Sequence, residues 1–374
     1  FRSEVDEILE QAVERSAPEC RHFGACGGGQ YQHMDAKTQL TMKQAILRET
    51  LERGGVQAPV DIDVLAGEPW YYRNRIRLAV DSSCCLGYRS RRSHSIVAME
   101  ECPIAAPLLV SAAKAFAEVA RAQQRMLRIN EVTLFCNTEE TQLLASVTAK
   151  SGDGVQFAAL AHAWVERVPQ LVGAELLVED RGGEIKHGAA WGAGSLSYQA
   201  AGITYRVDHG AFFQVNRWLV DPLVKRVTAG ETGGTAWDLY AGVGLFARQL
   251  TQSFERVIAV EPAPTATRAL EHNLRGSSGE ALTAQTLAFL RRSSREYPDL
   301  IVLDPPRTGL GAETTSLLMT IAAPTLVYVS CDPATLARDL KVLVGENYEI
   351  ESVTMVDLFP QSFHLETVVR LRHS

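Results

Sequence analysis

Residues 326–340 read Leu326-Val-Tyr-Val-Ser-Cys-Asp-Pro-Ala-Thr-Leu-Ala-Arg-Asp-Leu340, an apolar segment followed by a polar turn and a helix-like segment. Its apolar start, up to Val329, is short and rich in β-branched and aromatic residues, which predicts a buried strand. Pro333 ends the strand and suits the first turn of a helix. Cys331 is therefore expected at the carboxyl edge of a sheet, where open α/β sheets bind ligands. A helix N-terminus there would favour a thiolate, although a cysteine can equally be a small buried hydrophobe.

Composition limits the class of protein. The chain has 374 residues, 46% hydrophobic and 22% charged, which is typical of a globular protein of two or three domains. It has no apolar run long enough to cross a bilayer and no secretory signal, so we expect a cytoplasmic protein without membrane contact. Seven scattered cysteines do not suggest a disulfide framework. The net charge of −7 argues against a uniformly basic nucleic-acid binder.

The second half of the chain alternates strand-like and helical segments. From about residue 206 onward, this alternation predicts a parallel, doubly wound α/β sheet. The expected strands cover residues 235–240, 257–261, 300–304, 326–329, 353–359 and 367–371.

A glycine turn follows the first of these strands. Gly242 and Gly244 fit a nucleotide-type turn, and Glu261 ends the next strand about 20 residues later. Such an acid binds two ribose hydroxyls, but the pattern alone fits either NAD or S-adenosylmethionine. Asp304, followed by two prolines, ends a third strand at the same edge and can face a sulfonium-bearing ligand. Because no residue set for hydride relay is present, we expect S-adenosylmethionine.

The first part of the chain, residues 1–58, is expected to form a cysteine-containing loop and a helix over 34–54. Cys20 and Cys26 lie beside a glycine cluster, and Cys102 could supply a third metal ligand. His22 or His33 could instead complete a zinc site. A glycine-rich turn with unliganded thiols is the alternative.

The middle part, residues 59–205, reads as an α+β domain with a basic segment. Between Trp70 and Ala98, six arginines stand against one acidic residue, Asp81, a local net charge of +5. Arginine interleaved with tyrosine suits phosphate contact and base stacking, so we expect RNA binding here rather than an ordinary solvated strand face. The candidate contacts are Tyr72, Arg73, Arg75, Arg77 and Arg89, with Arg91 and Arg92 beside them.

A cysteine nucleophile beside a methyl donor suits the alkylation of an unreactive ring carbon. A thiolate that adds to carbon 6 of uracil makes carbon 5 nucleophilic, and a base must then remove the carbon-5 proton. Glu366 heads an apolar, strand-like run, where burial would raise its pKa toward the range of a useful base. A surface carboxylate at a strand end is the alternative interpretation.

Five motifs together resemble the RNA 5-methyluridine methyltransferases, which modify uridines in 23S rRNA or in the T-loop of tRNA. They are Phe212-Phe-Gln-Val-Asn216, Asp238-Leu-Tyr-Ala-Gly-Val-Gly244, Asp304-Pro-Pro-Arg-Thr-Gly309, the Ser330–Leu340 stretch and Phe359-Pro-Gln-Ser-Phe-His-Leu-Glu366. The similarity runs from about Cys20 to the C-terminus. It implies a C-terminal Rossmann-like class I methyltransferase domain over 206–374 and a central RNA-binding domain, with the family's N-terminal TRAM barrel absent.

The resemblance also implies roles for single residues. Cys331 would be the nucleophile and Glu366 the base. S-adenosylmethionine would be held by Gln214, Tyr240, Gly242, Gly244, Glu261, Gln285 near the adenine, and Asp304. We expect a monomer acting on RNA, 23S rRNA more than tRNA.

The chain departs from the family at the cysteines. Many members hold a 4Fe–4S cluster with four cysteines; Cys20, Cys26 and Cys102 match, but Gly29 stands at the fourth position. The site would hold an impaired cluster or none. Other readings are a methyltransferase acting on protein or small molecules, a tRNA T-loop enzyme, or a non-catalytic RNA-binding or iron–sulfur protein.

Overall fold

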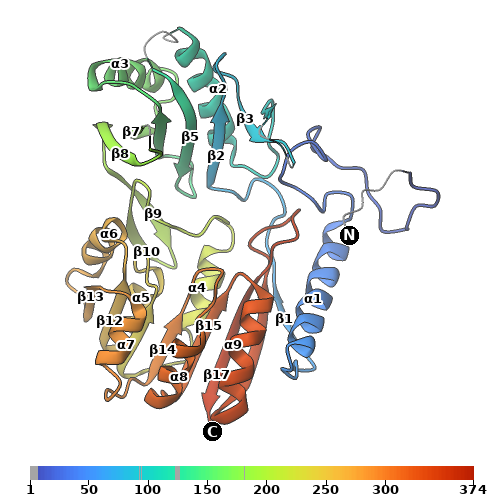
Figure 1. The fold of residues 1–374 in the computed structure, drawn as a ribbon, viewed down its shortest axis with the longest axis vertical. Helices are drawn as coiled ribbons and strands as arrows, with labels where there is room; N and C mark the ends of the chain where they lie inside the picture. Colours follow the sequence, from blue (N-terminus) through green and yellow to red (C-terminus); the bar gives the residue numbers. More distant parts are fainter. Residues whose placement is uncertain (1–6, 92, 94, 123–126, 181) are drawn as a thin grey trace.

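The computed structural model describes residues 7–91, 93, 95–122, 127–180 and 182–374. Its described residues form two large sheets and a hairpin. The smaller sheet, with its helices, lies above the larger one in Figure 1, and α1 stands along the edge of the lower part. Within this part of the chain, no helix is both long and apolar enough to span a membrane.

The larger sheet carries eight strands among the described residues, in the order β1-β16-β17-β15-β14-β11-β12-β13. All neighbours are parallel except β17, which is antiparallel to both β15 and β16. The strands are β1 (Asp63–Leu65), β11 (Gly233–Leu239), β12 (Phe254–Glu261), β13 (Gly279–Thr283), β14 (Leu300–Leu303), β15 (Thr325–Ser330), β16 (Tyr348–Val356) and β17 (Glu366–His373).

Helices cover both faces of this sheet because its central strands are apolar on both sides. Alternate residues point to opposite cores: Ala236 and Val327 pack on one side, Trp237 and Leu326 on the other. The first core takes in α4 (Val220–Thr228), α5 (Leu245–Leu250) and α6 (Pro264–Leu274). The second takes in α1 (Ala36–Arg53), α7 (Thr286–Arg292), α8 (Ala312–Ile321) and α9 (Pro333–Glu346).

The smaller sheet has the order β4-β3-β2-β5-β6-β7-β8. Its core includes Phe116 and Trp164, whose ring centroids lie 4.6 Å apart. Its elements are β2 (Arg75–Val80), β3 (Leu86–Arg89), β4 (Ile96–Ala98), α2 (Pro107–Ala122), β5 (Ile129–Cys136), β6 (Leu143–Ala149), α3 (Gly154–Val165), β7 (Leu171–Glu179) and β8 (Ile185–Gly192). The hairpin of β9 (Ser195–Ala200) and β10 (Ile203–Asp208) follows and packs into the core of the larger sheet.

The α/β architecture predicted for the second half is confirmed, with two corrections. The last strand is antiparallel, because the connection from β16 to β17 spans only residues 357–365 and a parallel return needs a longer crossover. The expected boundary at residue 59 does not follow the sheets either. Strand β1 pairs with β16 and so belongs to the larger sheet.

Candidate active site

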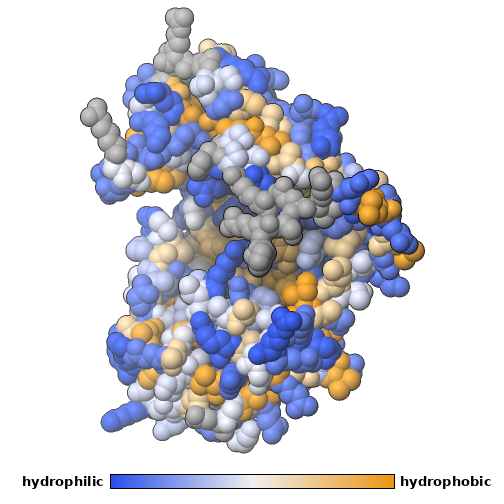
Figure 2. All heavy atoms as spheres, turned by 45° about the vertical axis from the view of Figure 1, so that its right-hand side comes forward, coloured by the Kyte–Doolittle hydropathy of each residue, from blue (hydrophilic) through white to orange (hydrophobic). Residues whose placement is uncertain are grey.

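A cavity of about 680 Å³ opens where the carboxyl ends of β11, β12, β14 and β15 meet. This is the edge at which open α/β sheets bind ligands. Figure 2 shows the surface hollowed between the part of the molecule built on the smaller sheet and the part built on the larger one. The sequence-predicted residues that border the cavity are Gln214, Tyr240, Gly242, Glu261, Gln285, Asp304, Cys331 and Glu366.

Strand register brings Cys331 and Glu366 to the same place. Ser330, the last residue of β15, pairs with Thr367 of β17. Because the two strands are antiparallel, the residue after Ser330 lies across from the residue before Thr367. The thiol of Cys331 and the carboxyl of Glu366 thus face one cavity although they lie on different elements.

The Cys331 thiol is half-buried between β15 and α9. Burial, and then the charge of Glu366, raise its pKa to about 11, although Arg307 acts in the opposite direction. We expected the helix N-terminus to favour a thiolate, but burial and the charge of Glu366 have the larger effect on the pKa of Cys331. The carboxylate of Asp332 already accepts the N–H groups of Ala334 and Thr335, at 3.0 and 2.9 Å, which offsets the positive end of α9.

Glu366 is 5% exposed and is the first residue of β17. Burial, with a contribution from the nearby charge of Asp304, holds the pKa of its carboxyl well above the usual range; Arg307 lowers it. A buried carboxylate with few stabilising partners is a strong base once it is ionised. This environment suits proton abstraction.

Asp304 follows β14 directly, and its N–H donates to the carbonyl of Leu239 on the neighbouring strand at 3.3 Å. Burial raises the pKa of the Asp304 carboxyl to about 7. It therefore changes charge near neutral pH at the wall of the cavity.

The glycine turn is held by Glu261. One oxygen of this buried carboxylate accepts the N–H of Gly242 at 2.9 Å, and the other accepts the N–H of Ala263 at 2.8 Å. Gly242 has φ +56°, and a Cβ added there would meet no atom within 4 Å. The carboxylate is thus fixed beside open space, with lone pairs left for a ligand such as a ribose diol.

Gly244 lies outside the cavity lining. Its φ is +87°, and an added Cβ would come within 2.5 Å of Leu270 Cδ1, so the residue serves the packing of the turn against α6. Behind it, the fully buried Asp238 accepts the N–H of Ala247 at 2.7 Å. Among the described residues, its other oxygen has no partner.

Arg307, Phe359 and His364 are among the residues that border the cavity without a role predicted for them. The rings of Phe359 and His364 lie 5.7 Å apart. Burial, and the nearby Arg307, lower the pKa of His364, which favours a neutral imidazole. The signal for His364 was its place two residues before Glu366, because residues two apart in an extended chain share a face.

The arginines expected to contact RNA differ in their exposure to solvent. Arg77 and Arg89 reach solvent, and Arg77 pairs with Glu131 at 2.6 Å. Arg75 lies over the Phe135 ring at 4.3 Å, and burial lowers its pKa to about 10. Arg73 is only partly exposed. Arg92 lies outside the described residues.

Tyr72 does not fit the role of an RNA contact. It is 0% exposed, and its hydroxyl donates to the carbonyl of Pro360 at 3.1 Å. The sequence pattern could not separate it from the exposed Tyr71, since neighbouring residues of an irregular segment need not share a face. Tyr72 instead anchors the segment between β16 and β17.

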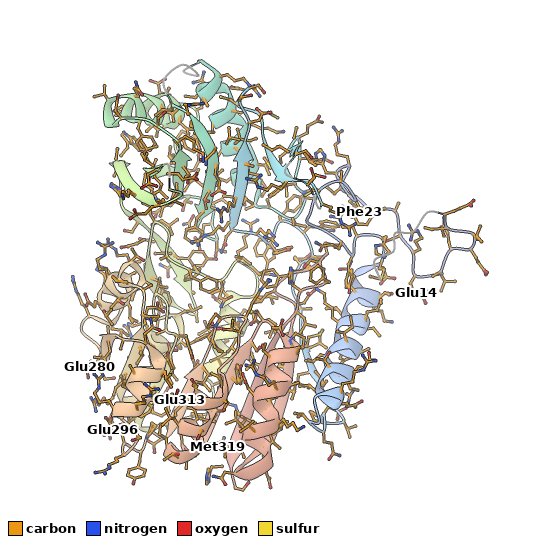
Figure 3. The ribbon with its side chains drawn as sticks, viewed as in Figure 1. Glu14, Phe23, Glu280, Glu296, Glu313 and Met319 are labelled. Atoms are coloured by element: carbon orange, nitrogen blue, oxygen red, sulfur yellow. The ribbon has the colours of Figure 1, made fainter. Side chains whose placement is uncertain are left out.

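The three cysteines lie in the N-terminal region and the loop after β4. Figure 3 shows this region beside α1, with Phe23 close to the body of the molecule and Glu14 farther out. Among the described residues, no group of three or more histidine, cysteine or acidic side chains could hold a metal ion. Gln32 fills the space at Gly29: a Cβ there would lie 2.6 Å from Gln32 Nε2, while Gln32 Oε1 accepts the N–H of Cys20 at 3.1 Å. The residues present do not fit a 4Fe–4S cluster.

Comparison with known proteins gives consistent relatives. The model of the tRNA (uracil-5-)-methyltransferase family matches residues 293–374. An uncharacterized RNA methyltransferase of Streptomyces avermitilis is 32% identical, over 99% of this chain and 86% of its own. A 23S rRNA (uracil(1939)-C(5))-methyltransferase of Pseudomonas entomophila is 30% identical, over 97% of this chain and 82% of its own.

Among solved structures, the tRNA (uracil-54, C5)-methyltransferase of Pyrococcus abyssi, in complex with S-adenosyl-L-homocysteine, has a similar fold. The TM-score is 0.79 at 22% identity, and the match covers 98% of this chain and 88% of that one.

Proposed function

This chain belongs to the RNA (uracil-C5) methyltransferase family, and from that premise we propose that it methylates a uridine of 23S rRNA through a transient bond between Cys331 and carbon 6 of the uracil ring. The observation that carries the proposal is the single cavity bordered by Cys331, Glu366 and the Glu261-held glycine turn.

S-adenosylmethionine, the cofactor of this family, supplies an electrophilic methyl group. Glu261 would accept its ribose hydroxyls, because the carboxylate is already fixed by two backbone N–H groups. Tyr240, Gln214 and Gln285 would border the rest of the cofactor, since they line the same cavity. Asp304 would face the sulfonium, where a carboxylate stabilises positive charge.

Cys331 would act as the nucleophile. Its thiol first loses a proton to solvent, and the sulfur then forms a bond to carbon 6 of the uracil. The electron pair of the ring double bond moves toward the carbonyl at carbon 4 and makes carbon 5 nucleophilic. Attack by carbon 5 would take the methyl group, with the bond from that group to the sulfonium sulfur broken and S-adenosylhomocysteine as the leaving group. Burial and the charge of Glu366 raise the pKa of the thiol to about 11, so the reactive thiolate is a small fraction near neutral pH.

Glu366 would complete the reaction. Its carboxylate takes the proton from carbon 5, the ring double bond re-forms, and the bond from carbon 6 to Cys331 breaks. Burial makes the ionised carboxyl more basic, which favours this step. The neutral His364 and the ring of Phe359 would pack beside the substrate base, since both border the cavity.

RNA would approach from the smaller sheet. The exposed Arg77 and Arg89 are proposed phosphate contacts, and the partly buried Arg73 and Arg75 would lie deeper. The preference for 23S rRNA rests on relatives of about 30% identity along nearly the whole chain. We further propose that the enzyme is a cytoplasmic monomer.

The decisive test uses RNA that contains 5-fluorouridine. Fluorine at carbon 5 leaves no proton for Glu366 to remove, so the bond to Cys331 cannot break and a covalent protein–RNA complex accumulates. We expect this complex with 23S rRNA fragments and S-adenosylmethionine, visible on a denaturing gel and mapped to Cys331 by mass spectrometry.

The matched variant is Cys331→Ala. It should form no complex and lower turnover by at least about a thousandfold, while binding S-adenosylhomocysteine as the wild type does. A complex with tRNA but not rRNA would overturn the choice of substrate. No complex with either RNA would overturn the covalent mechanism.

A further inference from the structure

A buried lysine of α1 binds the segment that leads to Glu366. Lys43 is 0% exposed, and its ammonium group donates to Asp357 Oδ1 at 2.6 Å and to the carbonyl of Phe359 at 3.0 Å. Burying a charged pair is costly and adds little net stability compared with apolar packing. The contacts of Lys43 join α1 to two residues of one connecting segment, Asp357 and Phe359.

Gln39, one turn earlier on the same helix, binds the same segment. Its Nε2 donates to Gln361 Oε1 at 2.9 Å, and its Oε1 accepts the Gln361 N–H at 3.0 Å. Gln361 has φ +66°, a left-handed conformation that costs energy for a residue with a side chain. The reciprocal pair with Gln39 therefore holds a backbone that would otherwise relax.

The segment 357–365, which these contacts fix, joins β16 to β17 and carries two cavity residues, Phe359 and His364. Glu366 follows it directly. The segment is also held by the Tyr72 hydroxyl, which donates to the carbonyl of Pro360 at 3.1 Å. Asn216, which precedes α4, donates from Nδ2 to the carbonyl of Leu358 at 3.2 Å. Side chains of α1 and of the loops before β2 and α4 thus hydrogen-bond to this segment at successive residues.

We propose that Lys43 and Gln39 are positioning residues for methyl transfer: α1 holds the 357–365 segment so that Phe359, His364 and Glu366 face the uracil ring. Figure 1 shows α1 beside α9, at the edge of the larger sheet and away from the glycine turn. The helix therefore contacts the wall of the cavity that carries the proposed catalytic base, Glu366, and not the wall that carries Glu261. This inference rests on the proposed role of Glu366.

The test is Lys43→Met, which keeps most of the unbranched side chain and removes its charged end. Because a misplaced catalytic group can cost up to about a hundredfold in rate, we expect turnover to fall by roughly tenfold to a hundredfold. Affinity for S-adenosylhomocysteine should stay within about twofold of wild type. Since proton removal is the affected step, a covalent complex with ordinary uridine RNA should accumulate.

Two variants serve as the positive and the negative control. Glu366→Gln should accumulate the same complex more fully, because it lacks the base. Lys37→Met, on an exposed position of α1, should behave as wild type. If Lys43→Met folds, keeps wild-type turnover and shows no complex while Glu366→Gln does, the positioning role is wrong and the proposed function stands.

If Lys43→Met does not fold, Gln39→Leu decides, with the same three measurements and a melting temperature. Loss of the fold in both variants would mean that α1 supports the whole domain, and this would also overturn the proposal. If neither Glu366→Gln with ordinary RNA nor the wild type with 5-fluorouridine RNA yields a complex, the proposed function itself fails.

Discussion

Cys331 and Glu366 lie opposite each other at the ends of two neighbouring strands, because Ser330 of β15 pairs with Thr367 of the antiparallel β17. The charge of Glu366 contributes to the raised pKa of the Cys331 thiol. The two groups are therefore coupled: whichever ionises first makes ionisation of the other harder. A reaction that needs a thiolate first and a carboxylate later must manage this repulsion.

The first prediction follows from that coupling. With a pKa of about 11, Cys331 in the free enzyme should react with iodoacetamide about tenfold faster for each pH unit from neutral upward, with a plateau only above pH 11. Glu366→Gln removes the nearby negative charge and should shift this profile to lower pH. Peptide-resolved mass spectrometry of Cys331 alkylation measures it. An unchanged or higher midpoint in the variant would contradict the coupling.

The second prediction concerns Glu261. In Glu261→Gln, the amide can accept only at its oxygen, so one of the N–H groups of Gly242 and Ala263 loses its acceptor. Hydrogen bonds to charged groups contribute about 1.5–3 kcal/mol. Affinity for S-adenosylhomocysteine should fall by roughly tenfold to a hundredfold in calorimetry. Glu255→Gln, exposed on the same strand, is the control, and an equal loss there would refute a specific role.

Features that depend on residues close together in the sequence could be predicted, and features that depend on distant pairing could not. Local signals placed β15, the glycine turn and Glu261, because strand periodicity and turn chemistry depend on near neighbours. The antiparallel direction of β17 and the addition of β1 to the larger sheet depend on long-range pairing, which no local pattern encodes. The burial of Tyr72 and the Lys43–Asp357 pair are likewise tertiary facts.

The third prediction separates charge from packing in RNA binding. Arg89→Ala should weaken binding at low salt and reduce the slope of log K against log salt by about 1, because one phosphate contact is lost. Tyr72→Phe should leave that slope unchanged, since Tyr72 is buried. Arg256→Ala is the control: Arg256 pairs with Glu280, which lies on the outer edge of the larger-sheet part (Figure 3). An Arg89 variant with the wild-type slope would remove it from the interface.

The fourth prediction concerns iron. The wild type should bind no stoichiometric iron or sulfide after anaerobic reconstitution, because Gln32 fills the space at Gly29. Gly29→Cys alone should bind less iron than the double variant with Gln32→Ala, since the end of the Gln32 side chain lies 2.6 Å from an added Cβ and must move to make room. Gly29→Cys combined with Gln32→Ala makes room for a fourth ligand beside Cys20, Cys26 and Cys102, and should bind iron. Iron and sulfide analysis checks this, and a loaded wild type would show that the cysteine loop rearranges around a cluster.

The fifth prediction concerns stability and pH at Asp238, where burial raises the pKa of the carboxyl to about 8. Its value in the unfolded chain is about 3.9, so the folded state binds the proton more tightly between these two values. The stability that this group contributes is complete below about pH 4 and is lost as the pH rises through 8.

Asp238→Asn removes this titration and keeps an oxygen that can accept the Ala247 N–H. The melting temperature of the variant relative to wild type should therefore rise from pH 5 to pH 8, by roughly 2–4 °C for each kcal/mol recovered. Thermal unfolding at the two pH values measures it. Asp61→Asn, at an exposed position, should keep a constant difference from wild type. If the melting temperature of Asp238→Asn relative to wild type is the same at both pH values, Asp238 is charged in the folded protein throughout this range. Its charge would then need a stabilising interaction besides the Ala247 N–H.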